Sequence, residues 1–172
     1  LDRGRPDLLE IGIAEFDISD LVEELGSDLQ DRVKQKGLDL RIESKVFSAF
    51  ADRARVRQVL DQLCDNAIKF TENGEINISA TDGDPGFVHV RVQDTGPGVA
   101  VDQRERIFDR FYQIQDEQSL TPGSGLGLSI AKEFTEIMGG HIWVEPNQPK
   151  GSAFVLALPS SDPDHLMATE GV

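Results

Sequence analysis

Residues 56–71 constrain the fold of this chain more than any other stretch. Their apolar side chains recur at the three- and four-residue spacing of one helix face and form a continuous stripe. The members of this stripe are Val56, Val59, Leu60, Leu63, Cys64 and Ala67. The opposite side carries amides and one lysine instead of mixed charges: Gln58, Gln62, Asn66 and Lys69. The sequence therefore predicts an amphipathic helix with one buried face and a polar face that is either simply solvated or functional.

The composition narrows the partners that the chain can bind. Its 172 residues suffice for one domain with a hydrophobic core, and 38% hydrophobic with 28% charged residues is typical of a soluble globular protein. The net charge is −14 and the pI is near 4.5, whereas a protein that binds a nucleic-acid backbone needs a basic surface. We therefore expect no nucleic-acid partner. ATP remains compatible with this charge, because a few local cations and backbone amides can hold a triphosphate.

The single cysteine and the two ends of the chain set further expectations. Cys64 lies on the apolar stripe and is expected to be a small buried hydrophobic residue, not a nucleophile. The sequence has no apolar run of membrane-spanning length and no secretory signal. It begins with Leu1 instead of Met, so we expect a piece of a longer protein. Residues 1–7 would be a linker from an upstream domain, and the polar residues 160–172 a disordered tail.

Periodic patterns predict strands and helices on both sides of the central helix. A helix over residues 18–36 turns five apolar residues inward, namely Leu21, Val22, Leu25, Leu29 and Val33. A last helix over residues 126–138 offers five residues to the core, namely Leu128, Ile130, Ala131, Phe134 and Ile137. Strands are expected at residues 8–17, 38–43, 46–50, 76–80, 88–92, 142–145 and 153–158. His89 is expected on the strand face opposite the neighbouring valines, as a surface or inter-layer histidine and not as a ligand.

The connection from residue 94 to residue 127 is unusually long for a compact domain, which is typical of a functional lid. It opens with DTGPG, and Asp94 directly follows a strand. A carboxylate held there can accept a hydrogen bond from the exocyclic amine of adenine and disfavours the carbonyl of guanine. Gly96 and Gly98 allow a sharp turn and a close approach of the base. Taken alone, the motif is also compatible with an ordinary turn.

A second glycine segment, GSGLG, closes this connection and precedes the last helix. The exposed amides at Gly123, Gly125 and Gly127, together with the helix N-terminus, can form an anion site. The spacing differs from the dinucleotide-binding fingerprint, and no Gly-Lys-Ser/Thr follows as in a Walker A motif. A flexible hinge explains this loop equally well.

Two further groups carry chemistry. On the polar face of the central helix, Asn66 can supply a carbonyl oxygen to Mg²⁺ and Lys69 a point charge to phosphate. Between the glycine segments, IFDRFYQ places Phe108 and Phe111 three residues apart. This segment is either a small hydrophobic plug or a hinge that docks a lid.

The order of these segments closely resembles the catalytic ATP-binding domain of sensor histidine kinases, a branch of the superfamily that includes gyrase, heat-shock chaperone and mismatch-repair ATPases. The resemblance extends over residues 17–159 and rests on four boxes in order. They are an N box (DNAIKFT, 65–71), a first glycine box (DTGPG, 94–98), an F box (IFDRFYQ, 107–113) and a second glycine box (GSGLGLSIAK, 123–132).

The resemblance implies an α/β fold: a two-layer sandwich of the Bergerat type, in which a mixed β-sheet is covered on one face by three helices. The catalytic ATP-binding domain would occupy residues 8–159, with a mobile ATP lid at about 99–122.

The same resemblance implies a site for ATP and Mg²⁺. Asn66 would be the Mg²⁺ ligand, and Lys69 would reach the phosphates. Asp94 would read adenine in a pocket that Gly96 and Gly98 shape. The residues implied around the rest of the nucleotide are Tyr112, Gly123, Gly125, Leu126 and Gly127.

Two positions depart from the pattern of the family. Gln62 stands where many histidine kinases have a second Asn, and its amide lies one methylene further out, so its role at the metal stays open. Gln113 stands where many members have an Arg that touches phosphate, with nearby Arg110 as the candidate substitute. Hydrolytic relatives have a Glu at the position of Gln62, and an amide cannot act as a general base. We therefore expect phosphoryl transfer by positioning and charge neutralisation, without efficient ATP hydrolysis.

The function implied is that of a protein histidine kinase in a two-component signal-transduction system, which donates the γ-phosphate of ATP to a histidine for relay to a response regulator. His89 and His141 fall on expected strands and His165 in the tail, so none resembles the accepting histidine. That histidine is expected on a helical-hairpin dimerisation domain of the parent protein. The chain alone is therefore expected to be monomeric and not to autophosphorylate, whereas the parent would be a homodimer.

The implied location is cytoplasmic, with membrane anchoring of the parent left open. The alternative is a degenerate module that senses nucleotide or docks a partner without phosphotransfer, which Gln62 and Gln113 support.

Overall fold

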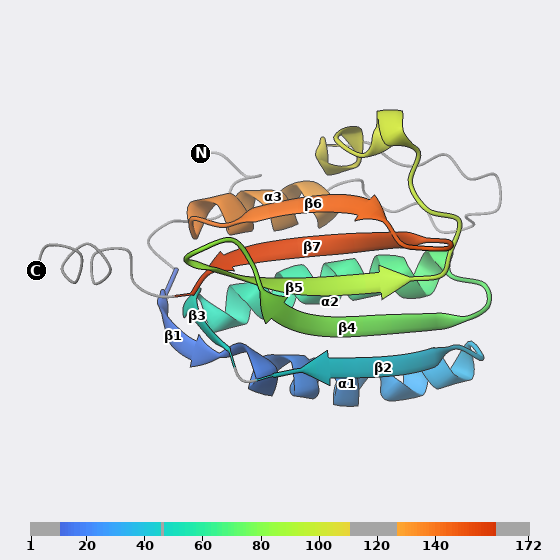
Figure 1. Cartoon of the computed structure of the whole chain (residues 1–172), viewed down its shortest axis with the longest axis horizontal. Coiled ribbons are helices and arrows are strands. Elements are labelled where there is room, and N and C mark those ends of the chain that lie inside the picture. The colour runs from blue at the N-terminus through green and yellow to red at the C-terminus, as the bar shows by residue number, and fades with distance from the viewer. Residues whose placement is uncertain (1–10, 46, 111–126, 161–172) are drawn as a thin grey trace, which may run out of the picture.

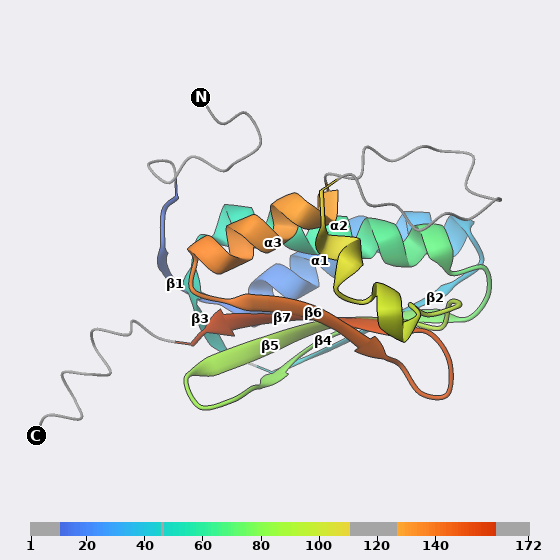
Figure 2. The same cartoon turned by 90° about the horizontal axis from the view of Figure 1, so that it is seen from above.

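The computed structural model describes residues 11–45, 47–110 and 127–160. It contains a five-stranded sheet covered on one face by helices, as Figures 1 and 2 show. The helices are α1 (Ile18–Gln35), α2 (Arg53–Phe70) and α3 (Gly127–Ile137). The strands of the sheet are β2 (Asp39–Ser44), β4 (Glu75–Asp82), β5 (Phe87–Asp94), β6 (His141–Pro146) and β7 (Ser152–Pro159). None of the helices in the described part of the chain is long and apolar enough to cross a membrane.

The sheet is mixed, with the strand order β2-β4-β5-β7-β6. Only β2 and β4 pair in parallel, and the other neighbours are antiparallel. The predicted hairpin of β4 and β5 is present, and β5 also pairs with β7 so that Gln93 lies opposite Ala153. The end of β5 therefore lies beside the start of β7. The predicted α/β sandwich with three helices on one face of a mixed sheet is confirmed.

The central helix α2 has the two faces that the sequence predicts. Every member of its apolar stripe is at most 1% exposed, because the stripe packs against the sheet and the neighbouring helices. Asp52 caps the helix: its side chain accepts hydrogen bonds from the backbone N–H groups of Ala54 and Arg55. Cys64 is fully buried, and burial raises the pKa of its thiol, so the predicted inert role is confirmed.

The helix α1 follows its prediction, whereas α3 departs from it. The predicted inward residues of α1 are all buried, and Asp17 caps the helix by accepting from the N–H of Ser19. In α3, Leu128, Ile130, Phe134 and Ile137 are only half-buried, and of the predicted core residues only Ala131 is buried. The other buried residues of α3 are Ser129 and Thr135, while Leu128 and Phe134 pack against the core without being fully buried.

Two short strands form a separate antiparallel sheet that the predictions placed too early in the chain. They are β1 (Ala14–Asp17) and β3 (Ser48–Ala51), where strands were expected at 8–17 and 46–50. The predicted linker 1–7, the second half of the predicted lid 99–122 and nearly all of the predicted tail 160–172 lie outside the described residues. The start of the lid segment contains two 3-10 turns, η2 (Val101–Gln103) and η3 (Arg106–Phe108).

The described part of the F box is anchored in the core. Phe108 is 6% exposed and its ring meets that of Phe154 edge to face, with ring centroids 6.2 Å apart. Arg110 lies 3.4 Å from a carboxylate oxygen of Glu133 on α3. The first residues of this segment are thus a hydrophobic plug against β7, while Phe111 and the residues that follow it lie outside the described part of the chain.

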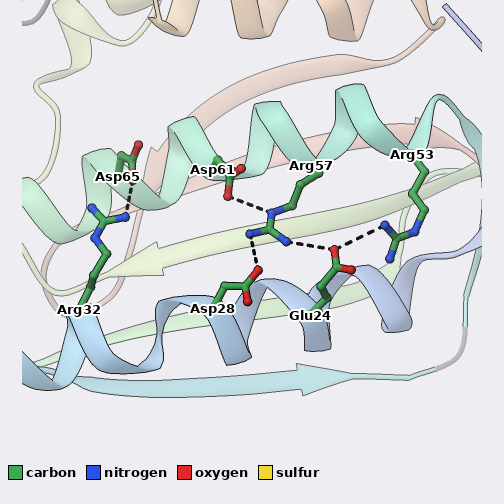
Figure 3. A network of polar contacts seen from close by, with 7 residues as sticks. All are labelled: Glu24, Asp28, Arg32, Arg53, Arg57, Asp61 and Asp65. Atoms are coloured by element: carbon green, nitrogen blue, oxygen red, sulfur yellow. Dashed lines mark hydrogen bonds and ion pairs between the residues drawn. The ribbon is translucent and has the colours of Figure 1, made fainter.

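A network of ion pairs joins α1 to α2 (Figure 3). Arg57 of α2 lies at its centre and donates hydrogen bonds to Glu24 and Asp28 of α1 and to Asp61 one turn along its own helix. The distances are 3.0, 2.8 and 3.0 Å, respectively, and the Arg57 side chain is only 23% exposed. Burial opposes the charge of Arg57, but these carboxylates keep its pKa above the ordinary value. Arg57 therefore holds together three carboxylates that would otherwise repel one another.

Replacement of Arg57 by Ala is expected to lower the free energy of unfolding by about 1 to 2 kcal/mol, because three ion pairs converge on one partly buried guanidinium, which exceeds the usual value of a single exposed pair. The shift in the urea midpoint measures this loss. Arg41→Ala is the matched control, since Arg41 makes an ion pair with Glu75 and its side chain is 64% exposed. A loss for Arg57→Ala no larger than that of the control would contradict a bracing role.

The sheet face opposite the helices carries an aromatic contact across β7, which lies between β5 and β6 in the sheet. His89 of β5 meets Trp143 of β6 edge to face, with ring centroids 5.3 Å apart. Its Nε2 is buried and accepts or donates no hydrogen bond among the described residues. Burial lowers the pKa of His89 and nearby Arg91 lowers it further, against the opposing charges of Asp84 and Glu145. The neutral imidazole is therefore the form that the fold favours.

Stability is expected to fall in acid because of His89. A pKa below the usual 6.5 means that the unfolded chain binds more protons in the window below that value, so the free energy of unfolding decreases as pH falls through it. Urea midpoints between pH 5 and 7.5 measure the effect, with the fluorescence of the single tryptophan as the signal. His89→Gln is expected to flatten the pH dependence. The same slope in both proteins would contradict this assignment.

Candidate functional site

Asp94 is held at the end of β5 by donors from two other segments. Its side chain is nearly buried, at 4% exposure. One carboxylate oxygen accepts hydrogen bonds from the N–H of Gly96 at 2.9 Å and from the N–H of Ser152 at 3.3 Å. The other accepts from the Ser152 hydroxyl at 2.9 Å. Because a carboxylate oxygen has two lone pairs, the second oxygen retains the capacity to accept from an amine.

The end of α2 brings polar atoms to the same place. A Cβ on Gly96 would lie 3.0 Å from the carbonyl oxygen of Phe70, 3.1 Å from Asp94 Oδ1 and 3.3 Å from Thr71 Oγ1. Thr71 is fully buried, and its hydroxyl has no hydrogen-bond partner among the described residues. A buried polar group of this kind is normally satisfied by water or by a ligand. The donor and acceptor set at this point therefore fits the polar edge of a purine base.

The polar face of α2 lies beside the start of α3. Gln62 and Asn66 are half-buried, and a Cβ on Gly127 would overlap with the Gln62 amide. Only glycine therefore fits at Gly127 while Gln62 keeps this rotamer. The structure thus places Gln62 and Gly127 in contact.

Lys69 is exposed at the C-terminal end of α2, where its ammonium lies 5.3 Å from the centroid of the Phe70 ring. A second lysine binds the carbonyl groups at this helix end: Lys36 of α1 donates hydrogen bonds to the carbonyl oxygens of Ile68 and Lys69. A cation at a helix C-terminus stabilises it, so Lys36 fixes the turn that leads into Thr71.

The residues present fit Mg²⁺ only if the metal is shared with a ligand. The described residues contain no group of three or more His, Cys, Asp or Glu side chains that could hold a metal ion. Mg²⁺ usually takes one or two protein oxygens and completes its octahedron with phosphate oxygens and water. The half-buried amide of Asn66 suits such a role.

Several predicted site residues fall outside the described part of the chain, namely Tyr112, Gly123, Gly125 and Leu126. Gln113 also lies outside it. Arg110, the candidate substitute for a phosphate-binding Arg, is occupied by its ion pair with Glu133 in this structure. Among the described residues, the predicted site therefore divides into the pocket around Asp94 and the polar face of α2.

Sequence reasoning missed the residues that β7 and the turn before it bring to Asp94. Ser152 supplies two of the hydrogen bonds to the carboxylate, and Asn147 donates to the Asp94 carbonyl oxygen at 2.8 Å. The sequence indicated only a turn there. The sequence shows only a serine at the start of an apolar strand, whereas the structure buries Ser152 to 5% exposure.

Comparison with known proteins agrees with this geometry. Residues 51–162 match the family described as histidine kinase-, DNA gyrase B- and HSP90-like ATPases, a span that contains α2, the Asp94 pocket and β7. The chain belongs to this family. The predicted resemblance to the histidine kinase branch is confirmed by the relatives and structures described next.

Individual relatives of this ATPase-family domain are sensor kinases. It is 35% identical over 147 residues to the adaptive-response sensory kinase SasA of Prochlorococcus marinus (strain MIT 9313). That match covers 84% of this chain and 40% of the relative. The chain thus spans about two fifths of the length of this curated relative.

Solved structures of histidine kinases share the fold. The catalytic domain of the histidine kinase ThkA has a TM-score of 0.76 and 32% identity, covering 87% of this chain and 96% of that domain. Full-length ShkA, solved in complex with AMPPNP, has a TM-score of 0.78 and 35% identity, covering 89% of this chain and 32% of ShkA. ThkA has also been solved in complex with the response regulator protein TrrA, with a TM-score of 0.73, 29% identity, and coverage of 88% of this chain and 42% of that chain.

Proposed function

We propose that this domain binds Mg-ATP and donates the γ-phosphate to a histidine on a helical-hairpin dimerisation domain of its parent protein. The observation that carries the proposal is the Asp94 pocket, where a buried carboxylate with a remaining acceptor site lies beside the Thr71 hydroxyl, which has no hydrogen-bond partner in the described part of the chain. That arrangement suits the amine edge of adenine. The parent would then be a two-component sensor kinase.

In this proposal the two parts of the site have separate tasks. Asp94 accepts a hydrogen bond from the exocyclic amine of the base, while Gly96 and Gly98 leave room for it. Asn66 offers its amide oxygen to Mg²⁺, which neutralises phosphate charge when bound. Lys69, exposed at the end of α2, reaches toward the phosphates. Tyr112 would lie near the nucleotide, and the triphosphate would be held by the second glycine box, namely Gly123, Gly125, Leu126 and Gly127.

The chain's own residues favour transfer over hydrolysis. Gln62 lies on the polar face of α2 one turn before Asn66. An amide has no useful basicity near neutral pH, so Gln62 cannot deprotonate an attacking water. Positioning and charge neutralisation are sufficient for transfer to a nucleophile that another domain supplies.

We infer further that residues 8–159 form the catalytic domain, that residues 99–122 act as its lid, and that the parent acts in the cytoplasm with a response regulator as its second partner. The ThkA–TrrA complex supports the last inference by similarity.

The decisive test combines this chain with the dimerisation hairpin of the same parent protein, Mg²⁺ and ATP labelled at the γ-phosphate. We expect acid-labile label on a hairpin histidine and none on this chain incubated alone. Tight ATP binding without any labelling would favour a nucleotide-sensing module that transfers no phosphate. Steady release of phosphate by the isolated chain at about 1 per second or faster would instead indicate a hydrolase.

A further inference from the structure

The turn between β6 and β7, residues 147–151, lies against the backbone of Asp94 although it belongs to none of the four sequence boxes. The turn is closed by a hydrogen bond from the N–H of Asn147 to the carbonyl oxygen of Gly151 at 3.1 Å. Pairing of β5 with β7 sets the end of β5 beside this turn, since Gln93 lies opposite Ala153. The two ends of these strands therefore form one unit.

The side chain of Asn147 spans the end of β5. Its Nδ2 donates to the carbonyl oxygen of Asp94 at 2.8 Å, and its Oδ1 accepts from Nε2 of Gln93 at 3.3 Å. An amide placed between an acceptor and a donor has only one orientation that satisfies both. Asn147 is therefore fixed, and it fixes the Asp94 peptide group in turn.

Glycine backbone completes this contact. Gly151 has φ +107°, and a Cβ there would overlap with the carbonyl oxygen of Asp94. A Cβ on Gly98 would lie 3.0 Å from the carbonyl oxygen of Gly151. The backbone of the turn at Gly151 thus lies directly against the carbonyl of Asp94 and against Gly98 in the loop after Asp94. A side chain on either glycine would not fit there.

Asp94 is consequently held on two sides. Ser152 and Gly96 bind its carboxylate, and Asn147 binds its backbone carbonyl. The direction of the remaining acceptor lone pair depends on both sets of bonds, because rotation of the peptide plane after Asp94 would displace the N–H of Gly96 that binds the carboxylate.

We propose that Asn147 is a positioning residue for base selection: its amide holds the Asp94 carbonyl so that the carboxylate faces the exocyclic amine of adenine. This inference rests on the proposed function of the Asp94 pocket. Asn147 itself touches no nucleotide in this account and acts only through Asp94.

The test compares ATP with ITP, which has a carbonyl in place of that amine. Asn147→Asp keeps the size of the side chain but replaces the donor by a carboxylate oxygen facing the Asp94 carbonyl. We expect the affinity of this variant for ATP to fall about 5- to 10-fold, which corresponds to the free energy of one hydrogen bond. The ratio of its affinities for ATP and ITP should become smaller. Asn147→Ala is expected to show the same narrowing with a smaller loss.

Gln148→Ala is the matched control, since Gln148 is an exposed amide in the same turn. Calorimetry supplies both affinities, and thermal midpoints report on folding. The inference would be overturned if both Asn147 variants kept the original preference for ATP over ITP. It would also be overturned if the variants lost the same affinity for ATP as for ITP and had a lowered thermal midpoint. If the unchanged chain binds neither nucleotide, the proposed function fails and this inference fails with it.

Discussion

Replacing Asp94 by Asn is expected to weaken ATP binding about 10- to 100-fold, which corresponds to the loss of a hydrogen bond to a charged group. The carboxylate is buried and oriented by Gly96 and Ser152, so the substitution keeps its shape and changes one acceptor into a donor. The amide can instead donate to the carbonyl of ITP. The preference for ATP over ITP should therefore shrink or reverse, and calorimetry with both nucleotides measures it.

Asp82→Asn is the matched control for this experiment. Asp82 is an exposed carboxylate at the end of β4, so its substitution removes the same charge from the same sheet. Equal effects of the two substitutions would mean that net charge, and not a specific contact, governs nucleotide binding. ATP affinity unchanged in Asp94→Asn would remove the main support for the proposed pocket.

Replacing Asn66 by Ala is expected to abolish most of the effect of Mg²⁺ on ATP binding and to slow phosphotransfer about 100- to 1000-fold, as when one oriented polar group is removed from a charged transition state. The described residues offer no carboxylate cluster that could take over the metal. Binding measured with and without Mg²⁺, together with single-turnover labelling of the dimerisation hairpin, separates affinity from chemistry.

Gln58→Ala provides the comparison for Asn66→Ala. Gln58 is an exposed amide on the same face of α2, two turns earlier, where it accepts from Arg55. Its loss should leave both measurements unchanged. If the Asn66→Ala protein still shows the full effect of Mg²⁺ on ATP binding, the metal is bound by Gln62 or by residues outside the described ranges.

The fold was predictable because its pattern is local. The stripe of α2 and the alternating valines of β5 reveal their buried faces within a few residues. For α3 the same reasoning was only partly right: Leu128 and Phe134 pack against the core but stay half-buried, whereas Ser129 and Thr135 are buried. Hydropathy ranks these two residues as polar, whereas close packing of helices favours their small size.

The site was predictable where one segment carries the chemistry. Asp94 and Asn66 stand in motifs that indicate their roles without reference to the rest of the chain. Ser152 could not be found in this way, since it lies 58 residues from the carboxylate that it binds. That contact depends on the register between β5 and β7, which no pattern within either strand specifies.

The position of β7 has a consequence for biosynthesis. β5 pairs with β7, and among the strands that the structure describes β7 is the last to leave the ribosome although it lies inside the sheet. Until residue 152 has emerged, the Asp94 carboxylate lacks its serine donors and β5 presents an open edge. Nascent chains should therefore be exposed to aggregation until β7 has emerged, and nucleotide can stabilise only the finished domain.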